Sequence, residues 1–485
     1  MASKNSKTKK SDLLYIMNPG CGWCVKANPV VDELVKDGHI ITTLDMRNPD
    51  DTKQANEVKS KHGVQCGTPL FIDAKTGNMV CGFREKDVLE KWAKGEEIPA
   101  PPPRPNPRNN QRNKVENDQN DQQAQWPRTQ FIKLDYVWLD GKKTKQLRSK
   151  TKFVTMTLEQ PPTPEYLLGI VPEGSFDGSS TNQAETEDSD CVLKPIRVYT
   201  NIMERQQNPS FIVLCEVFDS TGKPHKSNSR AKLRNTLDRL DNTDDLWFGV
   251  EQEYTIVESN TDKPFGWPED GDPKPQGDYY CGMGSNNVQG RRLAEQHAMM
   301  CNNTGVLLDG FHPEVMLSQW EYQTRPKIAL RAADDLWFSR YLLMKVAEMM
   351  NMSISFDPKP VQGDWNGSGA HINFSNKYMR ENSTIDYMNL LCAGLKETHD
   401  DAISVYGNGN DRRLSGKYET SAIDMFTWGE SDRSASIRIP LATINNNGMG
   451  HLEDRRPAAN VDPYEAFEYV SKTVNAITED MLITT

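Results

Sequence analysis

Two carboxylates occupy alternate positions in a strand-like segment of the chain. Residues 246–257 are mostly apolar or aromatic, and Glu251 and Glu253 lie two residues apart within them. Because alternate residues of a strand face the same side, both carboxylates are expected to project together. On an interior face they would repel each other and require cations. Taken alone, the pair is equally compatible with a solvated strand face.

Further acidic residues and a histidine favour a metal site. Glu314 and Glu321 stand in apolar and aromatic surroundings, and their odd separation requires a turn between them if they are to converge. His371 follows a glycine-rich run, and Glu453 precedes a run of Asp, Arg, Arg and Pro. Carboxylates together with one imidazole suit hard divalent cations such as Mg²⁺ or Mn²⁺.

Five arginines complete this set of charged residues: Arg412, Arg413, Arg433, Arg438 and Arg455. The guanidinium group is a rigid, permanently charged fork that matches phosphate and carboxylate oxygens. Acidic residues for metals and arginines for anions together point to metal-assisted phosphoryl transfer. Each of these segments alone is better explained by surface ion pairs.

A dithiol near the N-terminus indicates a different chemistry. Cys21 and Cys24 follow an apolar, strand-like run and precede a helical pattern. The N–H groups and the dipole of a helix N-terminus favour a thiolate, which lowers the pKa of the first cysteine. Cys24 would then resolve a mixed disulfide formed at Cys21.

Strands and helices alternate around the dithiol and indicate a small α/β sheet. From apolar runs and helical spacing, strands are expected at 13–16, 40–44 and 70–72, and helices at 28–35 and 87–94. In the longer C-terminal part, helices are expected at 229–241, 291–304, 334–350 and 387–406. Many β-rich pieces lie between these helices, so this part is expected to be α+β.

Composition divides the chain. The 29 residues 99–127 contain seven Pro, six Asn and five Gln. Such a stretch buries too little apolar surface to offset the entropy of ordering it, so residues 98–127 are expected to form a flexible linker. With 485 residues the chain exceeds what one hydrophobic core usually serves. We therefore expect one domain at 11–97 and the remainder of the fold from residue 128 onward.

Charge and cysteine content exclude several classes of protein. Acidic residues outnumber basic ones, 68 to 57, and the net charge of −11 argues against a nucleic-acid-binding scaffold. No apolar run approaches the ~18 residues of a membrane span, and the run 13–17 is too short for a signal peptide. Nine cysteines in so long a chain do not form a secreted disulfide framework, so a reducing cytoplasm is expected.

The N-terminal segment resembles the thioredoxin/glutaredoxin family over about 85 residues. The resemblance rests on the Cys-Gly-Trp-Cys motif at 21–24, on Lys26 and Pro29, and on the Gly-Thr-Pro motif at 67–69. It implies an α/β thioredoxin-like fold with a cis peptide bond before Pro69.

A redox site made of Cys21, Cys24 and Pro69 follows from this resemblance, with a thiol or disulfide as its partner. Two alternatives remain open. Cys66 and Cys81 are able to complete a structural zinc site with the dithiol, or the domain is kept as an interaction module without redox activity.

Nearly all of residues 131–465 resemble the eukaryotic-type glutamine synthetase family. Nine long motifs in the family's order carry the resemblance, at residues 176–181, 247–254, 276–282, 314–321, 356–360, 366–371, 412–416, 433–440 and 453–457. The resemblance implies a ligase that joins ammonia to the γ-carboxylate of L-glutamate through γ-glutamyl phosphate, with ATP as co-substrate.

The family resemblance also implies two or more Mg²⁺ or Mn²⁺ ions in each active site. One ion would position glutamate and the acyl phosphate, and its ligands would be Glu251, His371 and Glu453. The other would lie on the ATP phosphates, and its ligands would be Glu253, Glu314 and Glu321. Arg433 and Arg438 would neutralise phosphates, and Trp247 would lie beside the nucleotide.

Glutamate and ammonium are the other substrates implied by the resemblance. Glutamate would be held by Asn366, Gly367, Arg413 and Arg455. Asp177 would bind ammonium and take its proton, and Glu419 would close over the intermediate. Asp177, Glu419, Arg433 and Arg455 are thus the expected catalytic residues.

The family fold implies a β-grasp domain at 128–226 and a catalytic, barrel-like α+β domain at 227–485. In that family the active sites form between neighbouring subunits, and the loop carrying the Asp177 position enters the next subunit. A homo-oligomer of two stacked pentameric rings, a decamer, is therefore expected.

Five positions depart from the family pattern. Tyr418 stands where the family has histidine, Leu441 replaces an arginine, and His451 stands at a tyrosine position. Gly174 and Ser175 replace an aromatic residue and an asparagine. None of these changes removes an expected metal ligand, and Tyr418 bears most directly on turnover because it adjoins the closing residue.

Two other functions remain to be weighed against the ligase. One is a related enzyme that joins glutamate to an organic amine, and the other is a catalytically silent oligomeric scaffold that displays redox domains. The dithiol is also a candidate regulator of the ligase through one of its thiols: Cys191, Cys215, Cys281 or Cys301.

Overall fold

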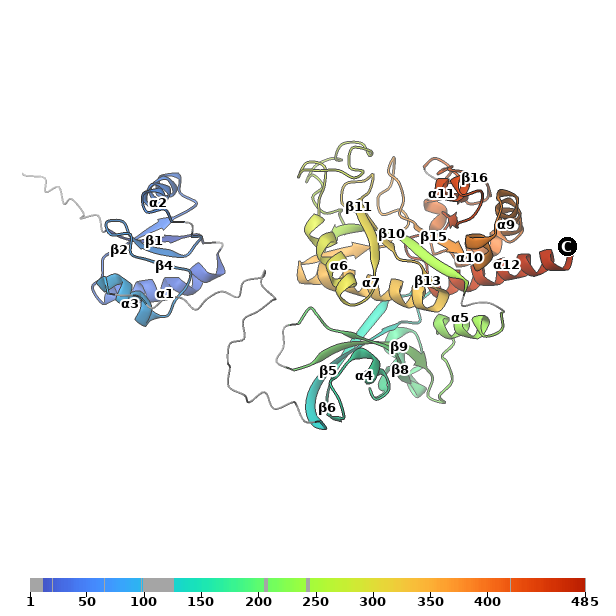
Figure 1. Cartoon of the computed structure of the whole chain (residues 1–485), viewed down its shortest axis with the longest axis horizontal. Helices are drawn as coiled ribbons and strands as arrows, with labels where there is room; N and C mark the ends of the chain where they lie inside the picture. The colour runs from blue at the N-terminus through green and yellow to red at the C-terminus, as the bar shows by residue number, and fades with distance from the viewer. Residues whose placement is uncertain are drawn as a thin grey trace, which may run out of the picture. The chain divides into compact units, whose positions relative to one another are not determined.

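The computed structural model describes residues 12–19, 21–64, 66–96, 98, 126–204, 208–240, 245–418 and 420–484. The chain divides into two compact units, Met1–Gln119 and Asn120–Thr485, and Figure 1 shows the elements of each. The predicted linker, 98–127, lies almost entirely outside the described residues. Among the helices that are described, none has the length and apolar character needed to cross a membrane.

The smaller unit is built on a four-stranded sheet in the order β2-β1-β3-β4. Strand β1 pairs parallel with β2 and antiparallel with β3, which pairs antiparallel with β4. Its strands are β1 Leu13–Met17, β2 Ile41–Asp45, β3 Leu70–Asp73 and β4 Met79–Cys81. Its helices are α1 Gly22–Lys36, α2 Pro49–Lys61 and α3 Lys86–Lys94.

All five elements predicted for this unit are present, and two further elements were missed. Helix α1 begins at Gly22, six residues earlier than predicted, so that Cys21 is the residue directly before the helix. Helix α2 was not predicted because only Ala55 of that helix is buried, which leaves almost no apolar periodicity. Strand β4 was not predicted because it has only three residues.

Apolar side chains pack on both faces of this sheet. Tyr15 and Phe71 belong to a cluster with α1 and α3, and Leu14 and Ile72 belong to a second cluster. Alternation along β1 explains the division, because neighbouring residues of a strand point to opposite faces.

Cys66 and Cys81 form a disulfide, with their Cα atoms 6.0 Å apart. This bond was not predicted. The disulfide also removes the structural zinc site considered for this unit, because two of the four proposed thiolate ligands are bonded to each other. As the resemblance implied, the Thr68–Pro69 peptide bond is cis.

The larger unit contains a five-stranded sheet in the order β6-β5-β9-β8-β7. The pairing of β5 with β9 is parallel, and the other pairings are antiparallel. The strands are β5 Arg128–Leu139, β6 Leu147–Leu158, β7 Gly174–Asp177, β8 Asp190–Thr200 and β9 Ser210–Phe218. Helix α4, Pro164–Leu168, contributes Leu167 to the core on one face.

A nine-stranded sheet follows, with the main order β11-β12-β10-β15-β18-β17-β16, and β13 and β14 also pair with β10. Only the pairing of β16 with β17 is parallel. The first strands are β10 Trp247–Glu258, β11 Leu308–Pro313, β12 Gln319–Thr324, β13 Lys327–Ile328 and β14 Met352–Ser355. The remaining ones are β15 Ala370–Ser375, β16 Trp428–Glu430, β17 Ile437–Ile439 and β18 Leu452–Asp454.

Helices supply the core on one side of this sheet. Phe248, Val250 and Tyr254 of β10 belong to one large hydrophobic cluster with residues of α6, α7 and α12. The helices are α5 Ser229–Leu237, α6 Arg291–Asn303, α7 Ala329–Met349, α8 Lys377–Glu381, α9 Ile385–Glu397, α10 His399–Val405, α11 Leu441–Asn445 and α12 Pro463–Thr484. Because even-numbered residues of β10 face this core, the odd-numbered residues face the opposite side.

Three of the four predicted helices of this unit are confirmed with small changes in their ends, and the fourth is wrong as a single element. The segment predicted as one helix, 387–406, is two helices that meet at Thr398. The Thr398 hydroxyl and carbonyl both bond to the hydroxyl of Tyr469 on α12, and the carbonyl also accepts from the Ala402 N–H.

Candidate active site

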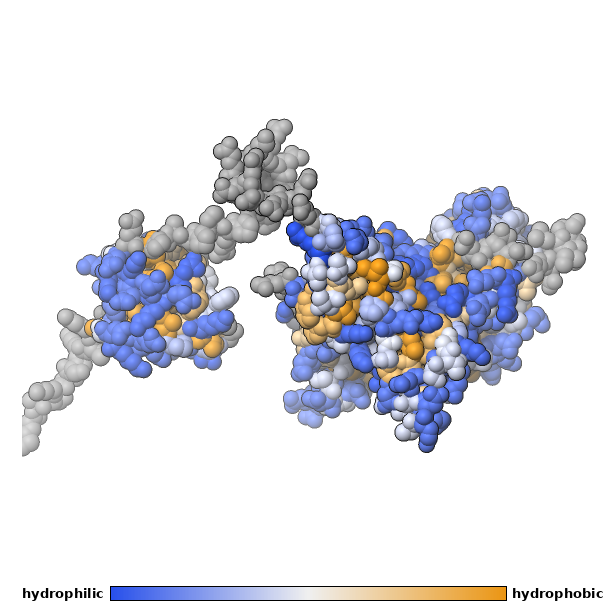
Figure 2. Space-filling view, turned by 90° about the horizontal axis from the view of Figure 1, so that it is seen from below, coloured by the Kyte–Doolittle hydropathy of each residue, from blue (hydrophilic) through white to orange (hydrophobic). Residues whose placement is uncertain are grey.

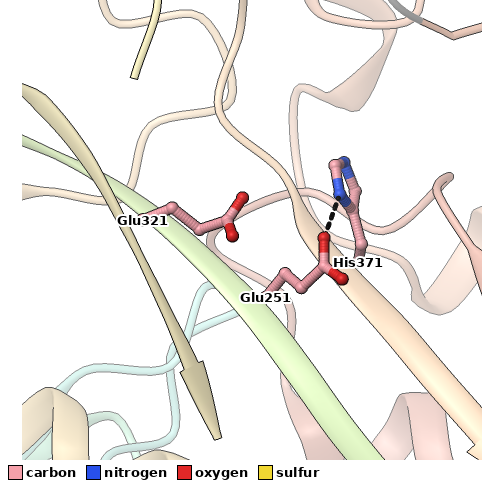
Figure 3. Close-up of side chains that lie close together, drawn as sticks. All are labelled: Glu251, Glu321 and His371. Carbon is pink, nitrogen blue, oxygen red and sulfur yellow. Dashed lines mark hydrogen bonds and ion pairs between the residues drawn. The ribbon is translucent and has the colours of Figure 1, made fainter. Parts of the chain in front are cut away.

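Strand register brings the predicted acidic residues onto one face of the nine-stranded sheet. Glu251 pairs with His371 on β15, and Glu253 pairs with Glu321 on β12. Glu321 in turn pairs with His312 on β11. Figure 3 shows Glu251, Glu321 and His371 projecting toward one another from three adjacent strands.

His371 lies at the centre of the first group of acidic side chains. Its Nδ1 is 3.4 Å from Glu251 Oε2 and 3.6 Å from Glu453 Oε1, and its Nε2 is 3.9 Å from Glu253 Oε1. Glu453 reaches this group from β18, which pairs with the other edge of β15. All of these side chains except Glu251 are buried.

A hairpin brings Glu314 and Glu321 together, as the sequence analysis required. Strands β11 and β12 are connected by a turn in which Ser318 has a φ of 74°. His312 lies between the two acids, with Nδ1 3.4 Å from Glu314 Oε1 and Nε2 3.6 Å from Glu321 Oε1. His312 was not among the predicted residues, although its place two residues before Glu314 puts it at the same alternation.

Electrostatic repulsion within this cluster is strong. Burial and the charges of Glu251 and Glu253 raise the pKa of Glu321 well above its usual range. Burial acts in the same direction on Glu251, but the hydrogen bond and charge of His371, the amide of Asn373 and the charge of Arg455 bring the pKa of Glu251 down to about 2. The protein's own hydrogen bonds and positive charges therefore stabilise the ionised form of Glu251 but not that of Glu321.

The donor set fits divalent cations. Within the described residues, two groups place one ligand atom of each member within 4.8 Å of the others: Glu251, Glu321 and His371, and then His312, Glu314 and Glu321. His312 Nδ1 is a buried atom without a hydrogen-bond partner. A hard cation would remove the repulsion and use this free nitrogen.

Glu253 and Glu453, which were also predicted to be metal ligands, have protein partners in this structure. The backbone N–H of Gly369 donates to Glu253 Oε2 at 2.8 Å, and the Gln319 amide donates to the same oxygen at 3.3 Å. Glu453 accepts from Arg438 at 2.8 Å and from Arg455 at 2.5 Å. The two predicted ligand sets adjoin each other, because Glu253 of one set lies 3.9 Å from His371 of the other.

A small pocket next to this cluster is lined by three of the four residues predicted to hold glutamate. The fourth, Arg455, is not among its lining residues and donates to Glu453. Its walls are Glu253, Asn366, Gly367, Arg413, Tyr418 and Thr420, and its volume is about 10 Å³. Arg413 donates to the carbonyls of Arg455 and Arg456 and lies 3.2 Å from His371 Nε2. A Cβ on Gly367 would lie 2.6 Å from Arg413 Cγ, and one on Gly369 would lie 2.5 Å from Arg413 Nη2. Arg413 is therefore seated in a groove that only glycine leaves open.

A larger cavity of about 630 Å³ opens on the other side of Glu251. Trp247, Asn373 and His451 line it, and the Arg380 guanidinium lies 4.1 Å from the Trp247 ring centroid. Burial lowers the pKa of His451, which favours a neutral imidazole in this cavity. Of the other family departures, Leu441 is exposed, and Ser175 lies on β7.

Arg433 is exposed on the segment between β16 and β17. Burial and the charge of Glu314 raise the pKa of Tyr280, whereas the charge of Arg433 acts on that hydroxyl in the opposite direction. Tyr280 also contacts the His312 ring, with the two centroids 5.3 Å apart. Arg433 thus lies on the side of the cluster where Glu314 and His312 are found.

Asp177 is a predicted catalytic residue that the structure does not bring to the cluster. Asp177 is exposed at the end of β7 in the five-stranded sheet. Hydrogen bonds from the hydroxyls of Ser179 and Ser180 lower the pKa of Asp177 to about 2. Such a carboxylate attracts a cation strongly but is a weak proton acceptor. Glu419 lies outside the described residues.

The opposite face of β10 is held by a buried arginine. Arg340 on α7 donates twice to Gln252 Oε1, at 2.6 and 2.9 Å. It also donates to the backbone carbonyls of Ala459 and Val461. Because Gln252 lies between Glu251 and Glu253, these hydrogen bonds hold the strand in place on the side opposite the two carboxylates.

The predicted dithiol of the smaller unit lies at the start of α1. The Cys21 thiol donates to the Thr68 carbonyl at 3.3 Å. Hydrogen bonds from the side chain and the backbone of Cys24 lower the pKa of Cys21, while burial raises the pKa of Cys24. Cys21 is the more exposed of the two.

Most of the thiols considered as regulatory targets are inaccessible. Cys191, Cys215 and Cys301 are buried, and burial raises the pKa of each. Cys281 is exposed and is therefore the one of the four that a redox partner reaches without unfolding the chain.

Comparisons with known proteins agree with this arrangement. Residues 226–472 match the glutamine synthetase catalytic domain family. The chloroplastic glutamine synthetase of Chlamydomonas reinhardtii is 45% identical over 349 residues, which are 70% of this chain and 90% of that protein. The glutamine synthetase of Yarrowia lipolytica is 42% identical over 351 residues, which are 72% of this chain and 92% of that protein. The cryo-EM structure of Plasmodium falciparum glutamine synthetase is similar in fold, with a TM-score of 0.57, 19% identity and 74% coverage of both chains.

Proposed function

This chain belongs to the glutamine synthetase family, and we propose that it joins ammonia to the γ-carboxylate of L-glutamate, with ATP as co-substrate and γ-glutamyl phosphate as intermediate. One observation carries the proposal. Glu251 lines the large cavity and Glu253 lines the small pocket, so two residues of one strand connect a nucleotide-sized space with an arginine-lined space for a small anion.

The larger cavity is the proposed ATP site. Trp247 offers an aromatic surface for the base, and Arg433 and Arg438 supply positive charge for the phosphates. Two divalent cations, Mg²⁺ or Mn²⁺, held by Glu251, Glu253, Glu314, Glu321, His371 and Glu453, would neutralise the charge that develops on the transferring phosphoryl group. We add His312 to this ligand set because it lies between Glu314 and Glu321.

The small pocket is the proposed glutamate site. Arg413 and Arg455 would bind the carboxylates, with Asn366 and the backbone of Gly367 orienting the amino acid. A carboxylate does not accept an amine without activation, because oxide is a poor leaving group; phosphorylation supplies a better one. The intermediate must then be kept from water, or it hydrolyses.

Ammonium capture is assigned to Asp177, with Glu419 closing the site. The low pKa of Asp177 supports binding of the cation, and deprotonation then requires the environment of the assembled site. We propose that Asp177 acts on a neighbouring subunit in a decamer of two pentameric rings. Half-exposed aromatic residues such as Phe131 and Phe153, and the hydrophobic areas on the surface of the larger unit (Figure 2), are compatible with subunit contacts.

For the smaller unit we propose a thioredoxin/glutaredoxin-like redox module. Strand order, the cis peptide bond at Pro69 and the placement of Cys21 before α1 support this assignment. Cys21 would attack and Cys24 would resolve. Reduction of a small aromatic disulfide by the reduced protein tests it, and a Cys21→Ser variant should lose that activity.

Glutamine formation by the purified full-length chain tests the ligase. Mg²⁺, ATP and glutamate are supplied with ammonium, hydroxylamine or methylamine. We expect glutamine with ammonium, loss of product in Glu253→Ala, and retained activity in Glu258→Ala, which removes a carboxylate from the far end of the same strand. Product with methylamine alone would favour the amine ligase. No product with any amine, in an intact oligomer, would favour the silent scaffold.

A further inference from the structure

The smaller unit contains a second pair of cysteines besides the dithiol at the start of α1. Cys66 and Cys81 form a disulfide with their Cα atoms 6.0 Å apart. Cys66 begins the irregular segment 66–69 that precedes β3, and Cys81 is the last residue of β4. Cys81 pairs with Leu70, the first residue of β3. The disulfide therefore joins the beginning of segment 66–69 to the strand that fixes its end.

Segment 66–69 contacts the more reactive thiol of the dithiol. The Cys21 thiol donates to the Thr68 carbonyl at 3.3 Å, and Thr68 lies two residues after Cys66. Hydrogen bonds of Cys24 are the largest causes of the lowered pKa of Cys21, and a hydrogen bond with the Thr68 side chain acts in the same direction. The position of Thr68 therefore affects how much of Cys21 is ionised at neutral pH.

Hydrogen bonds at both ends also hold this segment. At its beginning, the Cys66 carbonyl accepts from the Lys59 ammonium at 3.0 Å. At its end, the Pro69 carbonyl accepts from the backbone N–H of Gly82 at 2.9 Å. A Cβ on Gly67 would meet no atom within 4 Å, so the middle of the segment has open space on that side. The segment thus has room to shift once its covalent tie to β4 is opened.

A small thiol in solution has access to this disulfide. Cys81 is exposed and Cys66 is half-buried, and thiol–disulfide exchange requires that the attacking thiolate reaches one of the two sulfurs. Two molecules of a low-molecular-weight thiol balance the reaction. The first attacks the Cys81 sulfur as its thiolate, the S–S bond breaks, and Cys66 leaves as a thiolate that takes a proton. The second attacks the mixed disulfide, releases Cys81 as a thiol after protonation, and leaves the reagent oxidised to its own disulfide.

We propose that this disulfide is a second thiol–disulfide site of the smaller unit, and that its state controls the reactivity of Cys21 through the position of Thr68. Its chemical partner is a low-molecular-weight thiol such as glutathione. The inference rests on the proposed redox module. With the disulfide closed, Thr68 is held against Cys21 and the thiolate is favoured. With the disulfide open, this contact loosens and Cys21 reacts more slowly.

The test measures alkylation of Cys21 in the full-length chain. Cys24→Ala is introduced in all samples, so that Cys21 stays free without a reductant. Rates with iodoacetamide between pH 5 and pH 9, followed by mass spectrometry of the peptide that contains Cys21, give the midpoint. In the double variant Cys66→Ala/Cys81→Ala we expect a higher midpoint and alkylation about threefold slower at pH 7. An unchanged or lower midpoint would overturn the proposed control through Thr68.

Two further variants separate this control from a general loss of stability. Thr68→Val removes the hydroxyl and should raise the midpoint with the disulfide intact, and adding it to the double variant should change little more. Val80→Ala shortens a buried side chain next to Cys81 and keeps both the disulfide and Thr68, so its midpoint should match that of the unaltered strand. An equal rise in Val80→Ala would show that loss of stability alone is sufficient, and the inference would fail.

The reducing agent is tested on the chain that keeps both cysteines. After incubation with excess reduced glutathione, mass spectrometry should show the disulfide opened while circular dichroism shows that the chain is still folded. Alkylation of Cys21, measured after desalting, should then be slower by the same factor as in the double variant. This measurement also decides the question if the double variant does not fold. A disulfide that stays closed under these conditions would overturn its role as a redox site.

The outcomes distinguish this inference from the redox module itself, which is tested with Cys24 intact. If the reduced chain reduces a small aromatic disulfide but the midpoint of Cys21 is the same with Cys66 and Cys81 bonded or free, the inference fails and the redox module stands. If the midpoint responds but no form of the chain reduces a disulfide, the redox module fails and the control of Cys21 stands.

Discussion

Glu253 and Glu321 lie directly opposite each other on the adjacent antiparallel strands β10 and β12. Like charges at such a position destabilise a sheet, and both side chains are buried. The arrangement is stable when a cation lies between the carboxylates or when one of them keeps a proton. Metal binding and protonation at this face therefore compete, and both affect the stability of the fold.

Thermal stability of the metal-free protein should fall as the pH rises above about 5. The pKa of Glu321 is raised in the folded chain, so its contribution to stability is complete below the unfolded value, about 4.3, and is lost as the pH rises through the folded value. Mg²⁺ should restore the loss, and by several degrees more at pH 8 than at pH 5. Differential scanning fluorimetry at both pH values measures this difference.

Replacing Glu321 by glutamine should remove the pH dependence of the thermal stability. We expect metal-free Glu321→Gln to be more stable than the unaltered chain at pH 8 and to gain less from Mg²⁺. Glu430→Gln, on the exposed edge strand β16, is the matched control. An equal response to Mg²⁺ in all three proteins would contradict the assignment of this face as a metal site.

His312→Asn should weaken Mn²⁺ binding about tenfold or more. The imidazole of His312 lies within 3.6 Å of both Glu314 and Glu321, and loss of a metal ligand typically has an effect of this size or larger. Titration of free Mn²⁺ followed by electron paramagnetic resonance gives the affinity directly. His39→Asn, in the smaller unit, serves as control, and equal affinities for both variants would exclude His312 as a ligand.

Arg413→Lys should lower kcat/KM for glutamate by about a hundredfold. A lysine retains the charge but cannot present a planar fork, and it cannot reproduce the bonds of Arg413 to the carbonyls of Arg455 and Arg456. Arg412→Lys is a close control, because the guanidinium of Arg412, the residue next to Arg413, donates instead to Asp357 near the surface. Steady-state kinetics on both variants are sufficient; a similar decrease in the two would show that the loss is not specific to the pocket.

Alkylation of Cys21 should slow in a Cys24→Ala variant at neutral pH. The largest cause of the lowered Cys21 pKa is the hydrogen bond from the Cys24 side chain, so removing it raises that pKa and reduces the thiolate fraction. Rates with iodoacetamide between pH 5 and pH 9 give the midpoint. Cys281→Ser is introduced in all samples to remove the other exposed thiol; an unchanged midpoint would contradict the prediction.

Much of the site could be predicted because it is encoded locally. Alternation placed Glu251 and Glu253 on one face, and the odd spacing of Glu314 and Glu321 required the turn that the structure contains. His312 was not predicted, because its spacing from Glu314 is only a weak signal until the partner strand of this short segment is known. Only the pairing with Glu321 gives it a role.

Elements with weak periodicity, or outside the motifs, were not predicted. Helix α2 buries a single alanine. Helix α12 was overlooked although Phe467, Val470 and Val474 lie buried along one side of it, and helical spacing alone was enough to find it. The boundary at Thr398 was not predicted, because the contact of this residue with Tyr469, about seventy residues farther along the chain, leaves no mark on the local sequence pattern.

On the core-facing side of β10, Gln252 is bonded to the buried Arg340. The strand should therefore be unusually sensitive to insertion and deletion. Adding or removing one residue before Glu251 would exchange the two faces of the strand. Carboxylates would then meet the apolar core and Arg340, and the glutamine would face the acidic cluster. Variants with length changes should accordingly be tolerated in exposed connections, such as residues 220–224, and should abolish folding when they fall within residues 247–258.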